Sequence, residues 1–192
     1  TEEVDPLKVE SHIDLSCTEI EGQDLKRYFY AGLTWLKNNQ SLINSLNVFP
    51  IPDGDTGTNM FLTLKTAYAE IEDDADTNIG SIAKKFAHGS LMGARGNSGV
   101  ILSQILRGFA RALDDKEVMN ADLLVSALAE SRNTAYKGVV RPVEGTILTV
   151  IKDVALAAEK ARKKTNDLIK ILKDEIIKHK NSYGENLLLN FG

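Results

Sequence analysis

The residues best suited to chemistry lie in a short acidic loop that follows two prolines. Asp53 and Asp55 are separated by one glycine, so both carboxylates can turn toward a common point. Magnesium prefers oxygen ligands and typically takes one or two carboxylates together with substrate phosphates. Gly54 and Gly57 let a phosphate approach the backbone amides closely. The loop therefore predicts a magnesium and phosphate site, while its Asp-Gly and Thr-Gly pairs leave a plain polar turn as the alternative.

A calcium site of the EF-hand type is the other metal site to consider for this loop. Such a loop starting at Asp53 would need Asp or Asn at position 57, Gly at position 58 and Glu at position 64. The chain has Gly57, Thr58 and Leu64 there. The spacing therefore excludes the EF-hand.

A second loop combines glycines with small polar residues. The stretch Gly89–Gly99 holds four of the 14 glycines, and no part of the chain matches a P-loop or the G-x-G-x-x-G dinucleotide motif. Asn97, Ser98 and Gly99 can form the N-terminal cap of a helix and donate to phosphate oxygens, with Arg95 as a nearby cation. Close helix packing through small residues is the alternative. Two such helix starts in one helical chain favour a shared anion site.

Most of the chain has the apolar periodicity of helices, and these helices must position the two loops. From Glu21, apolar residues recur at helical spacing until Val48–Pro52 ends the pattern, because each proline biases its predecessor to an extended conformation. Thr58 or Asn59 is expected to cap a helix that runs to about Glu72. The remaining expected helices are Ile79–Leu91, Asn97–Leu113, Asn120–Tyr136, Gly145–Lys163 and Asp167–Lys180, with a short apolar tail at Leu187–Leu189.

The pattern as a whole predicts an all-α fold. No segment shows a strong period-two alternation of the kind that identifies a strand. We therefore expect seven or eight helices, mostly antiparallel neighbours joined by short loops. Residues 1–20 are acidic and weakly periodic, so we expect an N-terminal arm there and one domain over residues 21–192.

Composition narrows the class of protein. The 192 residues are 43% apolar and 26% charged, which suits one globular domain, and the net charge of −4 argues against nucleic-acid binding. Cys17 is the single cysteine, which excludes an internal disulfide and fits a reducing compartment. No apolar run approaches the roughly 20 residues of a membrane span, and the acidic start lacks the order of a signal peptide. These features predict a cytoplasmic protein.

Three blocks of the sequence resemble a known family. They are Asn47–Met60, Gly93–Gln104 and Arg141–Leu148. They resemble the DhaL-type nucleotide-binding domain, and within that group the N-terminal domain of the bacterial fatty-acid kinase A subunits. The similarity extends from about Ile20 to Lys164, and the first two blocks are long and specific.

The resemblance implies an antiparallel eight-helix barrel that holds ATP or ADP and a pair of Mg²⁺ ions at one end. Asp53 and Asp55 match its metal ligands. Val48 stands where dihydroxyacetone kinases carry an additional aspartate, and the adjacent Asn47 is expected to supply a neutral oxygen ligand. No residue is assigned a catalytic role. The positions that match phosphate or adenine contacts are Thr56, Gly57, Thr58, Asn59, Asn97, Ser98, Gly99, Gly138 and Ile147.

The implied activity is transfer of the γ-phosphoryl group of ATP to a fatty-acid carboxylate, which gives an acyl phosphate for phospholipid synthesis. The acyl chain would sit on a separate DegV-type fatty-acid-binding protein, and further C-terminal domains of the kinase would assist. The family also closes its site with an aspartate-glycine loop, which the stretch Asn181–Gly192 lacks. We therefore expect a piece of a longer kinase that is weak or inactive alone. Two alternative functions stay open: a dihydroxyacetone-kinase-type subunit and a non-catalytic nucleotide-binding adaptor. A homodimer also stays open as the oligomeric state.

Overall fold

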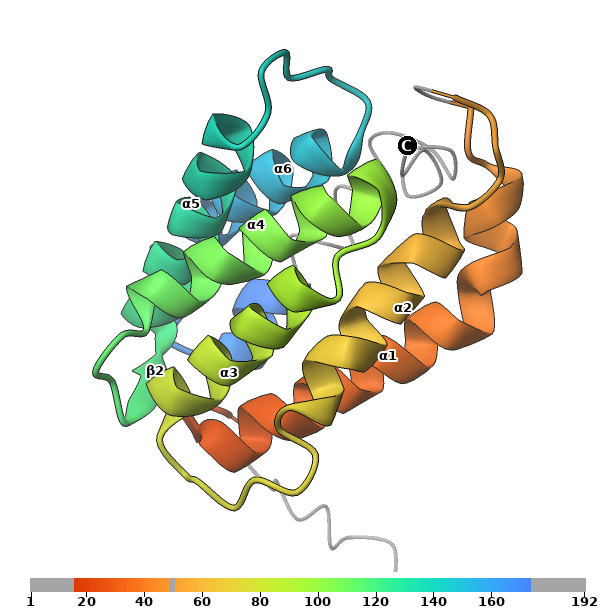
Figure 1. The fold of residues 1–192 in the computed structure, drawn as a ribbon. Coiled ribbons are helices and arrows are strands. Elements are labelled where there is room, and N and C mark those ends of the chain that lie inside the picture. The colour runs from red at the N-terminus through yellow and green to blue at the C-terminus, as the bar shows by residue number, and fades with distance from the viewer. Residues whose placement is uncertain (1–15, 49–50, 174–192) are drawn as a thin grey trace, which may run out of the picture.

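The computed structural model describes residues 16–48 and 51–173, which form a bundle of helices (Figure 1). These residues contain six complete helices and one pair of short strands, so the predicted all-α class is confirmed. A further helical stretch runs from Leu168 to Lys173. The described residues therefore hold seven helical segments, within the expected seven or eight but one fewer than the eight that the resemblance implies. The elements are β1 (Glu19–Glu21), α1 (Gly22–Ser45), α2 (Thr56–Ala69), α3 (Ile79–Met92), α4 (Gly96–Ala112), β2 (Val118–Asn120), α5 (Ala121–Lys137) and α6 (Ile147–Arg162).

Three expected segments lie wholly or partly outside the described residues. They are residues 1–15 of the N-terminal arm, the second half of the helix expected to reach Lys180, and the apolar tail Leu187–Leu189. No helix among the residues that are described is long and apolar enough to cross a lipid bilayer.

The start, buried face and end of α1 follow from local sequence. Glu21 and Asp24 form a capping box at its start, and apolar residues such as Leu25 and Ile43 are buried on the side that packs against α2 and α3. The helix ends at Ser45, shortly before the proline-containing segment that predicts its end.

The helices that follow the two motif loops begin earlier than expected. The N-cap of α2 is Asp55, not Thr58 or Asn59, because the Asp55 carbonyl already accepts the Asn59 N–H at 2.8 Å. α4 begins at Gly96, so residues 97–99, expected at its cap, lie in its first turn. The functional residues of both loops therefore sit on helix starts rather than ahead of them.

A two-stranded antiparallel ladder joins β1 to β2, although no strand was predicted. Ile20 pairs with Met119, and the two residues are 5% and 3% exposed. Strands of three residues are too short to produce the alternation that identifies a strand in sequence. Ile20 belongs to the segment expected as an arm, and the described part of that segment therefore contributes to the core.

Consecutive helices pack against each other and run in alternating directions (Figure 1). The starts of α2, α4 and α6 therefore lie at the same end of the bundle as the ends of α1, α3 and α5. The connections at this end are residues 46–55, 93–95 and 138–146. This up-and-down order brings both motif loops, and the third block of the family resemblance, to one end of the bundle, called the motif end below.

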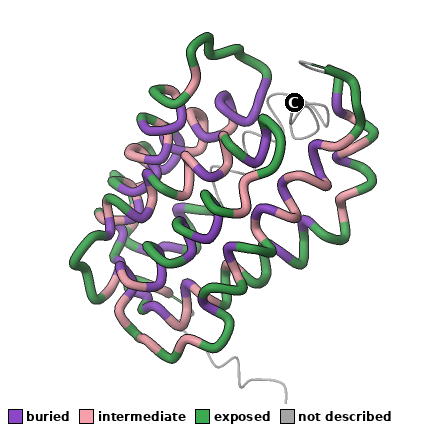
Figure 2. The backbone as a smooth tube through the Cα atoms, in the orientation of Figure 1, coloured by how far each residue is buried: buried purple, intermediate pink, exposed green. Residues whose placement is uncertain are grey.

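Every complete helix contributes buried apolar residues to the core, and Figure 2 marks the buried positions along the backbone. Phe29 of α1 stacks on Phe86 of α3, with ring centroids 3.8 Å apart. A smaller cluster of Ile43, Met60 and Ile147, with Leu36, joins α1, α2 and α6. This second cluster supports the helices whose ends or starts lie at the motif end.

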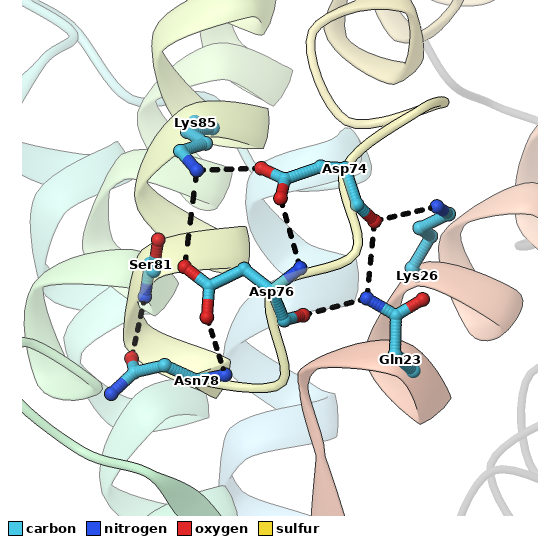
Figure 3. Close-up of polar contacts among 7 residues, drawn as sticks. All are labelled: Gln23, Lys26, Asp74, Asp76, Asn78, Ser81 and Lys85. Atoms are coloured by element: carbon cyan, nitrogen blue, oxygen red, sulfur yellow. Dashed lines mark hydrogen bonds and ion pairs between the residues drawn. The ribbon is translucent and has the colours of Figure 1, made fainter.

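At the end of the bundle opposite the motif end, a polar network fastens the α2–α3 loop to its neighbouring helices (Figure 1 and Figure 3). Lys85 of α3 forms ion pairs with Asp74 and Asp76. Gln23 of α1 donates to the backbone carbonyls of both aspartates, at 3.1 and 2.6 Å. Lys26 donates to the Asp74 carbonyl at 2.8 Å. These bonds fix α1, the loop and α3 relative to one another.

Candidate functional site

α2 and α4 begin in contact with each other. Ser98 Oγ donates to the Thr56 carbonyl at 3.5 Å. Gly96 has a φ of 58°, and a Cβ there would lie 2.3 Å from the side-chain nitrogen of Asn59. A residue with a side chain would be strained at this position and would also push the two helix starts apart. The two predicted phosphate loops are therefore neighbours in space.

The N-cap side chains of α2 and α4 make no capping bond among the described residues, although Asn44 of α1 accepts from the Thr58 N–H in the first turn of α2. α1 has a capping box, and Asn78, Asn120 and Thr146 cap α3, α5 and α6 through their side chains. The N-cap residues of α2 and α4, Asp55 and Arg95, make no such bond. The N–H groups of a helix start carry partial positive charge and are suited to bind an anion.

Asn47 holds Asp53 at the edge of this site. Asn47 Nδ2 donates to Asp53 Oδ1 at 2.7 Å. Asn47 is 7% exposed, and its own Oδ1 is buried with no hydrogen-bond partner among the described residues. A buried acceptor without a donor costs about 1 to 3 kcal/mol. A cation at this corner would satisfy it.

The side-chain oxygens of Asn47, Asp53 and Asp55, called the acidic corner below, are of the kind that a hard cation prefers. Asp53 and Asp55 supply carboxylates, and Asn47 supplies its unpartnered amide oxygen. Within residues 16–48 and 51–173, no group of three or more His, Cys, Asp or Glu side chains is placed to hold a metal ion. A Mg²⁺ ion here would therefore take its other ligands from phosphate and water, as is usual for this ion.

The rest of the predicted phosphate turn also serves the packing of α2 on α1. Thr56 and Gly57 are buried, and a Cβ at Gly57 would lie 2.5 Å from the Gln40 carbonyl oxygen. Thr58 bonds to the side chains of Gln40 and Asn44. The glycine is therefore required for the close approach of the two helices.

A pocket of about 370 Å³ opens beside the start of α4, a volume typical of sites for small organic ligands. Of the residues predicted to contact the nucleotide, Asn97 and Gly138 line it. Ile147 does not, because it is buried in the smaller core cluster, and its neighbours Thr146 and Leu148 line the pocket instead. The lining consists of Asn97, Val100, Ile101, Gln104, Gly138, Val139, Val140, Arg141, Val143, Thr146 and Leu148.

The comparison with known families adds a decisive observation. The family model of the DAK2 domain matches residues 50–182, which include both helix starts and the whole pocket lining. This chain belongs to the DAK2 domain family. It is therefore a DhaL-like nucleotide-binding domain of kinase type, as the resemblance implies. The closer likeness to the fatty-acid kinase A subunits stays a prediction.

The curated relatives of this DAK2 domain are much longer proteins. Two uncharacterized proteins of Staphylococcus aureus, from strain bovine RF122 / ET3-1 and strain USA300, are each 47% identical to the chain over 161 residues. The match covers 84% of this chain but 29% of each relative. The chain therefore spans less than a third of the length of the relatives it matches.

Glu144 anchors the loop that forms one wall of the pocket in this DAK2 domain. It accepts hydrogen bonds from Tyr136 at 3.1 Å, from Thr149 at 2.9 Å and from Lys152 at 2.6 Å. The Lys152 ammonium and the Thr149 hydroxyl lower the pKa of Glu144 below its ordinary value. Burial, and then the bond to Glu144, raise the pKa of Tyr136. The Arg141–Leu148 block contains Glu144, but its partners lie on α5 and α6, so the anchor forms only when these helices are packed.

Three valines of this loop form an apolar wall that the sequence prediction missed. Val139, Val140 and Val143 line the pocket. Val140 is 98% exposed and Val143 is 41% exposed, so part of this wall also faces solvent. The Arg141–Leu148 block pointed to this region, but the side of the loop that faces the pocket depends on its conformation.

Proposed function

We propose that this DAK2 domain binds ATP with Mg²⁺ at the motif end, as the nucleotide-binding part of a kinase. The observation that carries the proposal is a pair of helix starts that touch through Ser98 and Thr56. The N-cap side chains of both helices make no capping bond among the described residues. Two helix starts in contact offer partial positive charge from two sides. A polyphosphate carries the negative charge that such an arrangement attracts.

The pocket beside α4 fits the base of the nucleotide. Its walls include Val100, Val139 and Leu148, and an apolar wall suits the faces of a purine ring. Asn97 lies both in the pocket lining and in the first turn of α4. A nucleotide whose base fills the pocket would therefore have its phosphates beside the two helix starts.

The acidic corner fits the metal. Asp53 and Asp55 would hold a pair of Mg²⁺ ions, with Asn47 as an additional oxygen ligand. When bound, Mg²⁺ neutralises charge on the phosphates. The contribution of the chain itself is to orient the nucleotide between the pocket and the helix starts.

A fatty-acid carboxylate is the proposed acceptor because its attack needs no acid-base chemistry from this chain. The carboxylate is ionised at neutral pH, so one of its oxygens can bond to the γ-phosphorus without a general base, while the bond to ADP breaks. His88, the one histidine among the described residues, pairs with Glu70 at 3.0 Å. An alcohol such as dihydroxyacetone would need a base to take its proton.

The acceptor is proposed to arrive on a separate DegV-type fatty-acid-binding protein, with help from further C-terminal domains. The relatives are long enough to contain such domains, because the match to this chain occupies 29% of each. In this arrangement the present chain supplies ATP, and its partner supplies the acyl carboxylate.

Calorimetry of Mg²⁺-ATP binding tests the nucleotide site. The wild-type chain is expected to bind, and Asp53→Asn combined with Asp55→Asn is expected to abolish measurable binding. Asp73→Asn is the control, because Asp73 is an exposed acid on the α2–α3 loop at the opposite end. Unchanged affinity in the double variant would remove the metal assignment, and absence of binding by the wild type would remove the proposed function.

An acceptor assay with the longer protein that contains this domain tests the reaction. A fatty acid loaded on its DegV-type carrier is expected to yield acyl phosphate, trapped as a hydroxamate by hydroxylamine. Phosphorylation of dihydroxyacetone instead would assign the alternative substrate. Binding of ATP without transfer to either acceptor would make the domain a nucleotide-binding adaptor.

A further inference from the structure

The Thr58 hydroxyl is surrounded by hydrogen-bond donors. Thr58 lies in the first turn of α2, and its Oγ1 accepts from Gln40 Nε2 at 2.8 Å and from Asn44 Nδ2 at 2.9 Å. Both amides belong to α1, 18 and 14 positions earlier in the chain. The backbone N–H of Thr58 is also engaged, because it donates to Asn44 Oδ1 at 3.1 Å.

This arrangement leaves the hydroxyl proton of Thr58 available for one more hydrogen bond. A hydroxyl has one proton to donate and two lone pairs to accept with. Gln40 and Asn44 occupy both lone pairs. The orientation of the Asn44 amide is fixed, because its oxygen accepts from a backbone N–H that can only donate. The hydroxyl proton of Thr58 has no acceptor among the described residues, so it is held ready for an acceptor from outside.

We propose that Gln40 and Asn44 are positioning residues that set the Thr58 hydroxyl as a donor to a phosphate oxygen of the bound nucleotide. The inference rests on the proposed function, since the first turn of α2 is the proposed phosphate site. The inference also specifies which group of Thr58 contacts the phosphate. The hydroxyl does so, because the Thr58 backbone N–H already donates to Asn44. Neutral amides suit this task, because they supply donors without adding a charge beside the Mg²⁺ site.

Two variants of Thr58 test the contact by calorimetry, with Mg²⁺-ADP and adenosine as the probes. Thr58→Val keeps the shape but removes the hydroxyl, and it is expected to weaken Mg²⁺-ADP binding roughly tenfold or more, as for loss of a hydrogen bond to a charged group. Adenosine, which has no phosphate, is expected to bind Thr58→Val as it binds the wild type. Thr58→Ser keeps the hydroxyl and is expected to retain Mg²⁺-ADP binding.

A double-mutant cycle tests the positioning role. Gln40→Glu replaces a donor by an acceptor of the same shape, which would take the Thr58 proton for itself and weaken Mg²⁺-ADP binding. In a Thr58→Val background there is no proton to divert, so the same substitution is expected to have little further effect. If Gln40→Glu acted only through its charge, it would weaken binding by the same factor in both backgrounds.

The outcomes distinguish a failure of the proposed function from a failure of the Thr58 contact alone. Wild-type protein that binds neither Mg²⁺-ADP nor Mg²⁺-ATP would remove the proposed function and this inference with it. Wild-type binding with an unaffected Thr58→Val would overturn the inference alone. Equal penalties for Gln40→Glu in both backgrounds would overturn the positioning role of Gln40 and leave the Thr58 contact standing.

Discussion

Asn47 donates to Asp53 at 2.7 Å, while its own amide oxygen is buried with no donor in the part of the chain that the structure describes. This pair connects the segment after α1 to the acidic loop ahead of α2. A buried oxygen beside a carboxylate concentrates negative potential at one point, which is favourable only when positive charge is near. Asn47 is therefore the residue at which the metal site can be tested separately from the fold.

Asn47→Leu should weaken Mg²⁺-ATP binding by roughly tenfold or more, because it removes an oxygen ligand and releases Asp53. The free energy of unfolding should change by less than about 1 kcal/mol, since the substitution also removes an unsatisfied buried oxygen and the exposed Asp53 can bond to water. Calorimetry and urea unfolding measure the two effects. Asn39→Leu on α1 is the control, and equal affinities for both variants would exclude Asn47 from the metal site.

Gly57→Ala should destabilise the domain by about 1 to 3 kcal/mol, because the added Cβ would meet the Gln40 carbonyl oxygen at 2.5 Å. Gly32→Ala in α1 is the matched control, since no atom of the described residues lies within 4 Å of a Cβ there. That variant should be stabilised by about 0.5 to 1 kcal/mol, because alanine is the better helix former. Urea unfolding gives both values. The same sign for both variants would mean that α2 does not approach α1 so closely.

Acid should weaken the network of Asp74, Asp76 and Lys85. The Lys85 ammonium lowers the pKa of Asp74 below the ordinary 3.8, and bonds from Ser81 and the Asn78 N–H lower that of Asp76. Their contribution to stability is therefore complete above pH 3.8 and is lost as the pH falls through the lowered values. The pKa of Lys85 is raised, so its contribution is lost only above 10.5.

Melting temperatures measured from pH 7 down to pH 2 check this network. Lys85→Met should melt lower than the wild type at pH 7, and the difference between the two should shrink toward pH 2. Lys84→Met is the control, because Lys84 is exposed and its ion pair with the exposed Asp114 is longer than the Lys85–Asp74 pair, at 3.9 Å. A constant difference between Lys85→Met and wild type across this range would contradict the assignment.

The helices were predictable because each carries its own local signals. Asn120, the first residue of the helix expected from the sequence, directly precedes α5 and caps it. Leu25 and Ile43 keep the spacing of one buried face along α1. Such signals lie within a few residues of the element that they define, so they can be recognised without knowing the neighbours.

The missed parts of the candidate site depend on contacts between distant segments. Thr58 was expected to contact phosphate, but its bonds to Gln40 and Asn44 arise only when α1 and α2 are packed together. Ile147 lies between two residues that line the pocket, and the rotation of the first turn of α6 turns it to the core. Periodicity identifies a buried face, but it does not say whether that face meets the core or a pocket.

Ile147→Ala should therefore affect stability more than nucleotide binding. Ile147 is 6% exposed within the smaller core cluster, so its truncation should cost about 2 to 4 kcal/mol of unfolding free energy. Adenosine affinity should stay within about twofold of the wild type. Leu148→Ala is the comparison, because Leu148 is buried and also lines the pocket, so it should lower both. Loss of adenosine binding in Ile147→Ala, at a temperature where the variant is folded, would mean that Ile147 does contact the adenine base.

Glu144→Gln should loosen the pocket wall with little effect on the fold. The side chain is 59% exposed, and such surface ion pairs contribute about 1 kcal/mol or less to stability. Adenosine affinity should fall a few-fold, because the loop loses its anchor to Lys152. Glu159→Gln is the control, because Glu159 pairs with Arg132 away from the pocket.

The pH dependence of adenosine binding distinguishes an anchor from a general weakening. The pKa of Glu144 is lowered below the ordinary 4.5, so the anchor is complete above pH 4.5 and is lost as the pH falls through the lowered value. Wild-type affinity should therefore be constant from pH 7 to pH 5 and should fall below pH 4.5 more steeply than that of Glu144→Gln, in which only protonation of the adenine ring lowers binding. Calorimetry at each pH, limited to conditions where circular dichroism shows folded protein, provides the measurement. An identical decline in both proteins would mean that another group sets the shape of the pocket.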